Sequence, residues 1–130
     1  MRELKFRAWG KDSKEFIYVE LKDNASVQDN SWRYNGYNEW EQYTGLKDKN
    51  GRDIYEGDIV KRTKPHEFLK NVEETEIFRI RWGVRKAGFF AYNKQRKKHN
   101  MPAKRLNAED VYEVIGNVHE NPGLLEGDKK

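Results

Sequence analysis

Apolar and polar positions alternate at the amino-terminal end of the chain. Apolar and basic residues alternate between Leu4 and Trp9, and a polar segment at residues 10–14 separates this run from a second apolar run at residues 16–21. A period of two is typical of a strand with one buried face. The two runs therefore predict an amino-terminal β-hairpin with basic residues on its outer face, as in an ordinary surface strand.

The central part of the chain contains two turn signals. Asn50-Gly51 predicts a two-residue type I′ turn, which needs positive φ at both central positions, so residues 43–46 fold back on residues 54–55. A second turn is predicted at residues 56–58, where Gly57 supplies positive φ and the Asp58 side chain bonds to nearby backbone. An apolar β run resumes at residues 59–60, so this region predicts a tight β meander.

Two segments of the chain predict irregular structure. Residues 22–38 are rich in Asp, Asn, Ser and Gly and predict a loop, with a short strand at residues 32–34. We expect the loop aromatics to pack into the core, although a stacking platform for nucleobases is the alternative. Residues 62–76 contain Pro65 and alternate in charge without a clean period, which predicts a long connection.

The carboxyl-terminal half predicts another hairpin and one final strand. Strand alternation at residues 76–82, a turn at residues 83–88 and an apolar run at residues 89–92 predict the hairpin. Residues 93–104 are basic and polar and predict a loop. Asn107 is expected to cap one helical turn, and residues 111–115 predict a last strand.

Two long strings of residues resemble the signature of the YopX family of phage and prophage proteins. Residues 42–61 read Gln-Tyr-Thr-Gly-Leu-Lys-Asp-Lys-Asn-Gly-Arg-Asp-Ile-Tyr-Glu-Gly-Asp-Ile-Val-Lys, and residues 113–125 read Glu-Val-Ile-Gly-Asn-Val-His-Glu-Asn-Pro-Gly-Leu-Leu. The amino-terminal Lys-Phe-Arg-Ala-Trp run is also similar to the family. The signature residues that carry the resemblance are Tyr43, Thr44, Gly45, Asn50, Gly51, Ile54, Tyr55, Gly57, Asp58, Gly116, Asn117 and Pro122.

The strand pattern predicts a mainly β protein, and the resemblance implies an SH3-like barrel with an amino-terminal hairpin extension. We expect residues 1–42 to form the hairpin and loop, residues 43–125 the barrel, and residues 126–130 a polar tail. A length of 130 residues suits one domain. Such barrels serve nucleic-acid and peptide binders alike, and the family has no established activity, so fold alone does not decide function.

Composition limits the compartment and the core. The chain has no Cys, which excludes disulfides and thiolate sites and suits a reducing cytoplasm. It lacks a signal-peptide core and any apolar run near the ~20 residues that span a bilayer, so we expect a cytoplasmic protein of the bacterial host with no membrane contact. Four Trp, seven Tyr and six Phe compensate for few aliphatic residues and should form much of the core.

Enzyme motifs are absent from the sequence. It has no phosphate-binding glycine loop and no nucleophile elbow, and the histidines at 66, 99 and 119 lack metal-ligand spacing, so we expect no catalytic residue, cofactor or metal. The acids Asp48, Asp53, Glu56 and Asp58 could hold Mg²⁺ or transfer protons, but turn chemistry and pairing with nearby Lys or Arg explain them more simply. The missing motifs thus predict a non-enzymatic protein, and the resemblance to the YopX family implies a phage or prophage accessory protein.

Basic residues concentrate in one stretch, residues 79–108, which contains none of the 22 acidic residues. Its cations are Arg79, Arg81, Arg85, Lys86, Lys94, Arg96, Lys97, Lys98, Lys104 and Arg105. This stretch predicts a contact surface for DNA or RNA, with nearby aromatic rings able to stack, and a merely solvated face is the alternative. The competing hypothesis is a homo-oligomeric interaction module for a host or phage protein, assembled through strand edges such as those of the amino-terminal hairpin.

Overall fold

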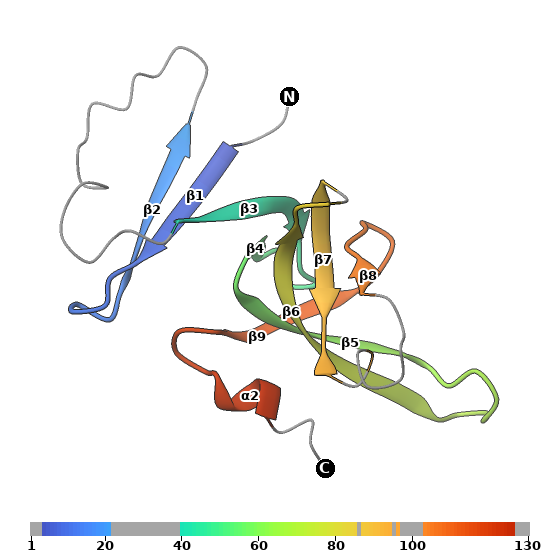
Figure 1. Ribbon diagram of the computed structural model, residues 1–130. Helices are drawn as coiled ribbons and strands as arrows, with labels where there is room; N and C mark the ends of the chain where they lie inside the picture. Colours follow the sequence, from blue (N-terminus) through green and yellow to red (C-terminus); the bar gives the residue numbers. More distant parts are fainter. Residues whose placement is uncertain (1–3, 22–39, 86, 95, 97–102, 127–130) are drawn as a thin grey trace.

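The chain folds into two antiparallel sheets. The computed structural model describes residues 4–21, 40–85, 87–94, 96 and 103–126. The first sheet has the strand order β2-β1-β3-β4 and consists of β1 (Leu4–Trp9), β2 (Phe16–Leu21), β3 (Trp40–Lys47) and β4 (Asp53–Tyr55) (Figure 1). The second has the order β8-β7-β6-β5-β9 and consists of β5 (Asp58–Pro65), β6 (Glu73–Gly83), β7 (Gly88–Tyr92), β8 (Lys104–Arg105) and β9 (Tyr112–Asn117). A short helix, α2 (Gly123–Glu126), follows.

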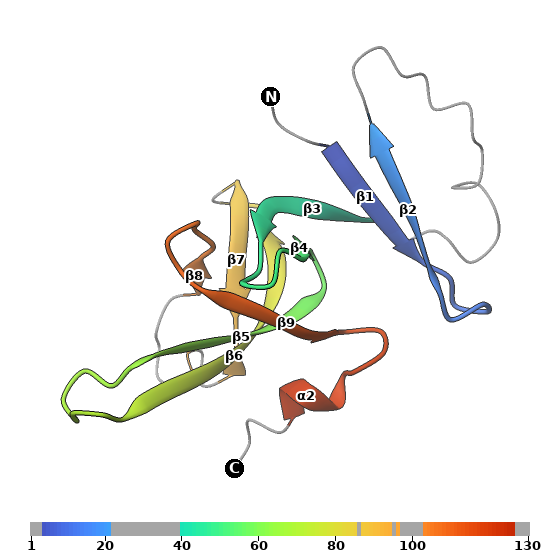
Figure 2. The ribbon, with the colours of Figure 1, turned by 180° about the vertical axis from the view of Figure 1, so that it is seen from behind.

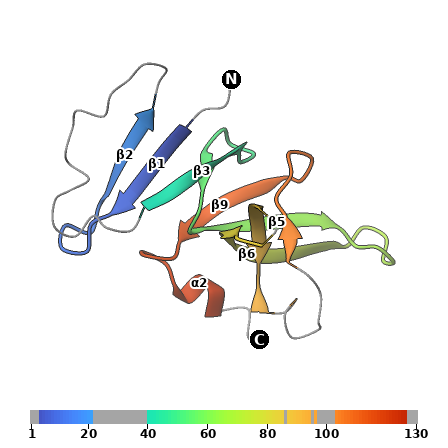
Figure 3. The ribbon, with the colours of Figure 1, turned by 45° about the horizontal axis from the view of Figure 1, so that its top comes forward.

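The two sheets do not close into a barrel, so the expectation of a closed SH3-like barrel is wrong. β3 pairs with β1 on one side and with β4 on the other, and therefore does not join β8 or β9 at the edges of the second sheet. Figure 3 shows β3 beside β1 and β9 beside β5, in separate sheets. The predicted division of the chain at residue 43 stays a prediction.

The amino-terminal hairpin is confirmed. β1 and β2 pair along their full length, from Leu4 opposite Leu21 to Trp9 opposite Phe16. The hairpin is joined to the rest of the first sheet because Ala8 also pairs with Trp40 of β3. The short strand predicted at residues 32–34, and the packing of the aromatics around it, lie outside the described residues.

The hairpin at Asn50-Gly51 is confirmed, but its turn type is not. Gly51 has a φ of 82°, whereas Asn50 is not among the described residues with positive φ. The Gly51 N–H donates to the Asp48 carbonyl at 3.0 Å, and Asp48 N–H donates to the Arg52 carbonyl at 2.7 Å. The loop is therefore a three-residue turn that ends in a left-handed glycine, the form with a bulge. Asp48 causes the difference, because its carboxylate accepts the Asn50 and Arg52 N–H groups, each at 2.9 Å.

The second predicted turn is confirmed. Gly57 has a φ of 82°, and the Asp58 carboxylate accepts the N–H of Tyr55 at 2.8 Å. This turn connects β4 of the first sheet to β5 of the second.

The long connection predicted at residues 62–76 is wrong, because β5 and β6 continue through it as a hairpin. Pairing extends to Pro65 opposite Glu73. This part of the hairpin projects from the body of the protein (Figure 2), so both of its faces meet water and no apolar period is needed. The hydroxyls of Thr63 and Thr75 lie 3.2 Å apart across the strands.

Later elements are confirmed in part. Residues 107–110 form a turn rather than a helix, and Asn107 caps it by accepting the N–H groups of Glu109 at 2.9 Å and Asp110 at 3.0 Å. The last strand continues through Gly116 and Asn117. The sequence did not predict β8 or α2. Among the described residues, no helix is long and apolar enough to cross a membrane.

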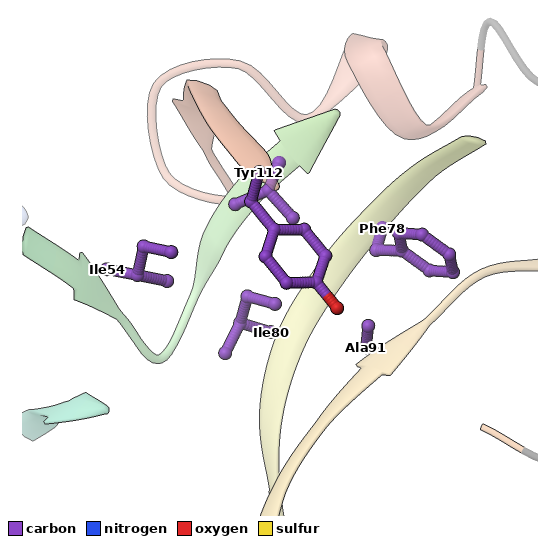
Figure 4. Close-up of a cluster of buried hydrophobic side chains, with 6 residues drawn as sticks. Ile54, Phe78, Ile80, Ala91 and Tyr112 are labelled. Atoms are coloured by element: carbon purple, nitrogen blue, oxygen red, sulfur yellow. The ribbon is translucent and has the colours of Figure 1, made fainter. Parts of the chain in front are cut away.

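The core lies between the second sheet and β4. Ile54, Val60, Phe78, Ile80, Ala91 and Tyr112 form its buried cluster, and Figure 4 shows most of them converging from β4, β6, β7 and β9. Aromatic residues are buried, as expected: Trp9, Tyr43, Tyr55 and Phe89 are also buried, and Phe90 is buried on the opposite face of β7.

Candidate nucleic-acid interface

The strand register of β6 assigns its alternate side chains to two faces. Phe78 and Ile80 enter the core, so Arg79 and Arg81 between and after them lie on the outer face. Arg79 is opposite Tyr92, Arg81 is opposite Phe90, and Phe90 is opposite Arg105 of β8. Directly paired residues share a face of the sheet. The outer face of β6, β7 and β8 therefore combines three arginines with two aromatic rings.

The arginines of this face lie against the rings. The guanidinium of Arg81 is 5.4 Å from the centre of the Tyr92 ring, and that of Arg105 is 4.7 Å from the centre of the Phe90 ring. Two glycines leave space for the Phe90 ring and the Arg105 guanidinium. A Cβ at Gly83 would lie 2.8 Å from the Phe90 ring, and one at Gly88 would collide with the Arg105 guanidinium. Such contacts orient cations without neutralising them.

A shallow pocket of about 280 Å³ lies next to these rings, at the turn between β6 and β7. Gly83, Val84, Arg85, Phe90 and Tyr92 line it. We call the surface formed by Arg79, Arg81, Arg85, Phe90, Tyr92 and Arg105 the arginine face.

The ten predicted basic residues fall into four groups, one of which is Arg105 alone, stacked on the Phe90 ring. Within the part of the chain that the structure describes, no carboxylate lies within ion-pair distance of Arg79, Arg81, Arg85 or Lys94, and all four are exposed. In contrast, Arg96 pairs with Glu76 at 3.1 Å and Lys104 pairs with Asp110 at 2.7 Å. Lys86, Lys97 and Lys98 lie outside the described residues. Glu76 thus holds Arg96 against the sheet, where its side chain is 15% exposed.

A second polar centre, the Arg7 junction, joins the two sheets. Arg7 is 4% exposed, and its guanidinium bonds to Glu41 at 2.8 Å and to Asp58 at 2.9 Å. It also donates to the Glu56 carbonyl at 3.0 Å. The centres of the Phe16 and Tyr55 rings lie 4.3 and 4.9 Å from the guanidinium, so Arg7 contacts both aromatic rings and carboxylates.

Electrostatics at the Arg7 junction favour the ionised guanidinium. Burial opposes the charge of Arg7, but attraction to Asp58 and Glu41 outweighs burial and raises the Arg7 pKa. Burial also raises the pKa of Asp58, against the pull of Arg7. His119 closes the junction, with Nε2 3.1 Å from the Glu41 carboxylate and its ring stacked on Trp9 at 5.2 Å.

The signature residues divide between two places. The β3–β4 hairpin contains Tyr43, Thr44, Gly45, Asn50, Gly51 and Ile54, and the Thr44 hydroxyl donates to the Ile54 carbonyl at 2.8 Å. The residues around the Arg7 junction are Tyr55, Gly57, Asp58, Gly116 and Asn117. Pro122 immediately precedes α2. A pocket of about 440 Å³ opens there between β2 and the segment after β9.

Sequence reasoning missed Arg7, Glu41 and His119 as members of this junction. Arg7 looked like an outward residue of a surface strand, because alternation does not reveal which polar position faces a second sheet. The available signal was that Arg7 and His119 lie within the strings that resemble the family.

The acidic cluster has structural roles. Asp48 accepts a third bond, from the N–H of Val114 at 3.0 Å; burial raises its pKa, but these hydrogen bonds outweigh burial and lower it. Asp53 lies between Lys5 at 3.2 Å and Lys47 at 2.7 Å. Glu56 accepts the Gln42 N–H at 3.0 Å rather than pairing with a nearby cation. Among the described residues, no group of three His, Cys, Asp or Glu side chains is placed to hold a metal ion.

Comparisons with known proteins give one family model and a similar solved structure. The family model described as YopX protein matches residues 5–126. The crystal structure of protein EF1440 from Enterococcus faecalis is similar to this chain, with 27% sequence identity and a TM-score of 0.54. The similarity covers 94% of this chain and 97% of that one. Among curated proteins, none matches the chain.

Proposed function

The chain belongs to the YopX family, and we propose that it binds DNA or RNA through the arginine face without catalysing a reaction on it. We infer a role as an accessory protein of a phage or prophage, acting on nucleic acid in the host cytoplasm. The observation that supports binding is the absence of carboxylates beside Arg79, Arg81 and Arg85 within the described residues. These guanidinium groups keep their full charge for phosphate oxygens, and Arg binds phosphate bidentately.

The chemistry of the arginine face suits binding without strong sequence preference. Arg81 and Arg105 lie over the rings of Tyr92 and Phe90, and a guanidinium over a ring face can still donate hydrogen bonds from its edge to a phosphate. Tyr92 is half-buried, which leaves part of its ring available for stacking on an unpaired base. Single-stranded nucleic acid is therefore the favoured ligand.

The proposal does not include catalysis, because the acidic residues are held by contacts within the fold. Asp48, Asp53 and Asp58 are each held by two or more contacts within the fold. General acid–base chemistry needs a carboxylate within reach of a substrate proton. On the arginine face, the described residues provide none.

Salt-dependent binding tests this proposal. Fluorescence anisotropy should be measured with labelled single-stranded DNA, duplex DNA and RNA over a series of NaCl concentrations. Binding should release counterions from the phosphates that contact five exposed or ring-stacked cations: Arg79, Arg81, Arg85, Lys94 and Arg105. The logarithm of the binding constant should then fall with the logarithm of the salt concentration with a slope of roughly −3 to −5. Absence of binding to all three probes at low salt would refute it.

A second candidate function, a protein-interaction module, draws on a different region. The β5–β6 hairpin carries apolar side chains at its projecting end, which nucleic-acid binding does not explain. The expectation that the amino-terminal hairpin mediates self-association stays a prediction.

A further inference from the structure

The projecting part of the β5–β6 hairpin ends in an exposed apolar tip. Phe68 is 84% exposed, Leu69 56% and Val72 42%. Scattered apolar residues are common on protein surfaces, but three of them at the end of one projection mark an interaction site. We call residues 66–74 the hairpin tip.

The hairpin tip is ordered by one histidine. His66 Nδ1 accepts the N–H groups of both Phe68 and Leu69, each at 3.0 Å, and the His66 N–H donates to the Val72 carbonyl at 2.7 Å. The other ring nitrogen lies 3.1 Å from the Glu74 carboxylate. A tip that is already folded loses less conformational entropy on binding than a flexible one.

Acidic residues outnumber basic residues in the hairpin tip. Residues 66–74 contain Glu67, Glu73 and Glu74 against one lysine, Lys70, and Glu74 also lies 3.9 Å from Lys64. The tip therefore combines exposed apolar side chains with a net negative charge. A complementary surface would be a shallow apolar pocket within a positive border.

The same chain carries such a surface. The pocket between β6 and β7 has a volume of about 280 Å³, and Val84, on its wall, is 83% exposed. Arg85 lines the pocket, and Arg81 and Arg105 lie over its two rings, Tyr92 and Phe90. We propose that the hairpin tip of one copy docks into this arginine-bordered pocket of a second copy.

The positions of the two surfaces favour a reciprocal pair. The hairpin tip lies at the start of β6 and the pocket lies at its end, after Gly83. Two copies arranged antiparallel along β6 would place each tip at the pocket of the other, in a closed two-fold dimer. Each contact is far smaller than the ~800 Å² per partner of a standard interface. We therefore expect a weak dimer that dissociates on dilution and in high salt.

Replacement of one exposed side chain tests the docking directly. Phe68→Ser should make the protein monomeric at concentrations where the parent dimerises, as measured by sedimentation velocity. The matched control is Val111→Ser, which removes another exposed apolar side chain, 59% exposed, outside both surfaces and should dimerise like the parent. Circular dichroism melting should show the parent midpoint for both variants, because neither side chain is in the core.

A mixing experiment separates docking from other routes to association. Arg85→Glu alone should also be monomeric, because it reverses the charge of the pocket border. A mixture of Phe68→Ser and Arg85→Glu should associate more than either variant alone but less than the parent, since one of the two contacts in the mixed pair is intact. A monomeric parent at millimolar concentration, a dimeric Phe68→Ser variant or a mixture that stays monomeric would each overturn the proposal.

The docked hairpin tip and a bound nucleic acid would use the same surface, because the pocket is part of the arginine face, but each proposal can fail without the other. Phe68→Ser leaves the arginine face intact and should bind the DNA and RNA probes at least as well as the parent. If the parent dimerises as expected but binds no probe, only the proposed function fails.

Discussion

The Arg7 junction and the arginine face use the same side chain in opposite ways. At the junction, one guanidinium is 4% exposed and is held by Glu41 and Asp58 within 3 Å. On the arginine face, Arg79 and Arg81 are exposed, and the described residues give them no carboxylate. Both environments stack a guanidinium on aromatic rings, so the contrast lies in burial and pairing.

This difference separates charges that hold the fold from charges that are available for a ligand. A buried ion pair contributes little net stability compared with apolar packing, but removal of one partner leaves an uncompensated buried charge. An exposed cation can be removed at almost no cost in stability. Substitutions in the two regions should therefore have opposite effects on stability and on binding.

Loss of the central cation at the junction should have the largest effect. We expect Arg7→Leu to lower the free energy of unfolding by about 3 to 5 kcal/mol, because it strands the carboxylates of Glu41 and Asp58. Urea unfolding measures this change. Arg81→Leu is the matched control and should change stability by less than ~0.5 kcal/mol. Equal losses in the two variants would contradict the contrast.

The junction also constrains a glycine. Gly57 and Gly51 both have a φ of 82°, so an Ala at either site adopts a left-handed conformation at a cost of about 1 to 2 kcal/mol. At Gly57 the new Cβ would also collide with the Glu41 carboxylate, whereas at Gly51 it would meet no atom within 4 Å. Gly57→Ala should therefore destabilise by about 1 to 3 kcal/mol more than Gly51→Ala. Thermal unfolding of both variants gives the difference, and equal midpoints would show that Glu41 can move away.

Carboxylates paired outside the junction should make the fold sensitive to acid. Burial raises the pKa of Glu76, but hydrogen bonding and attraction to Arg96, with attraction to Arg62, outweigh it and lower that pKa. The pKa of Asp53 is likewise lowered, because its bonds to Lys47 and Lys5 outweigh burial. A lowered pKa stabilises the fold above the ordinary value of the group, and this stability is lost as the pH falls through the lowered value.

The melting midpoint of the parent should accordingly fall as the pH drops from the ordinary carboxylate pKa values through the lowered ones. We expect the melting midpoint of Glu76→Gln to be lower than that of the parent at pH 7. On acidification, the midpoint of Glu76→Gln should fall by less than that of the parent. Glu109→Gln, which removes an exposed carboxylate, should follow the parent. The raised pKa of Asp58 acts in the opposite sense: its contribution is present at low pH and is lost as the pH rises through the raised value. Identical acid profiles for Glu76→Gln and the parent would contradict the pairing.

The sequence predicted the local elements of the fold better than their arrangement. The hairpin at Asn50-Gly51, the turn at Gly57 and the strand pair around Trp82 and Phe89 follow from turn chemistry and period-two alternation, which are local signals. Barrel closure depends on which edge β3 pairs with, and alternation does not contain that information. The hairpin of residues 62–76 was missed because a strand that is exposed to solvent on both faces shows no alternation of apolar and polar residues.

The candidate site was predictable only in part, for a similar reason. The basic stretch indicated the region of the arginine face, but only the register shows that Arg79 and Arg81 share a face with Arg105. Pairing removed Arg96 and Lys104 from the set, since Glu76 and Asp110 come from distant segments. Arg7 was unrecognised because its partners, Glu41 and Asp58, lie 34 and 51 positions away in the sequence.

The most direct measurement compares the salt dependence of binding after removal of unpaired and of paired cations. Arg79→Gln/Arg81→Gln removes two charges that have no carboxylate partner among the described residues, while Lys49→Gln/Lys61→Gln removes two charges that share Glu113, at 3.8 and 3.2 Å. Both double variants lose the same net charge. We expect the first to flatten the log–log salt slope on single-stranded DNA by about 1.4 and the second to leave it unchanged. Equal changes in the two variants, or an unchanged slope in the first, would contradict binding at the arginine face.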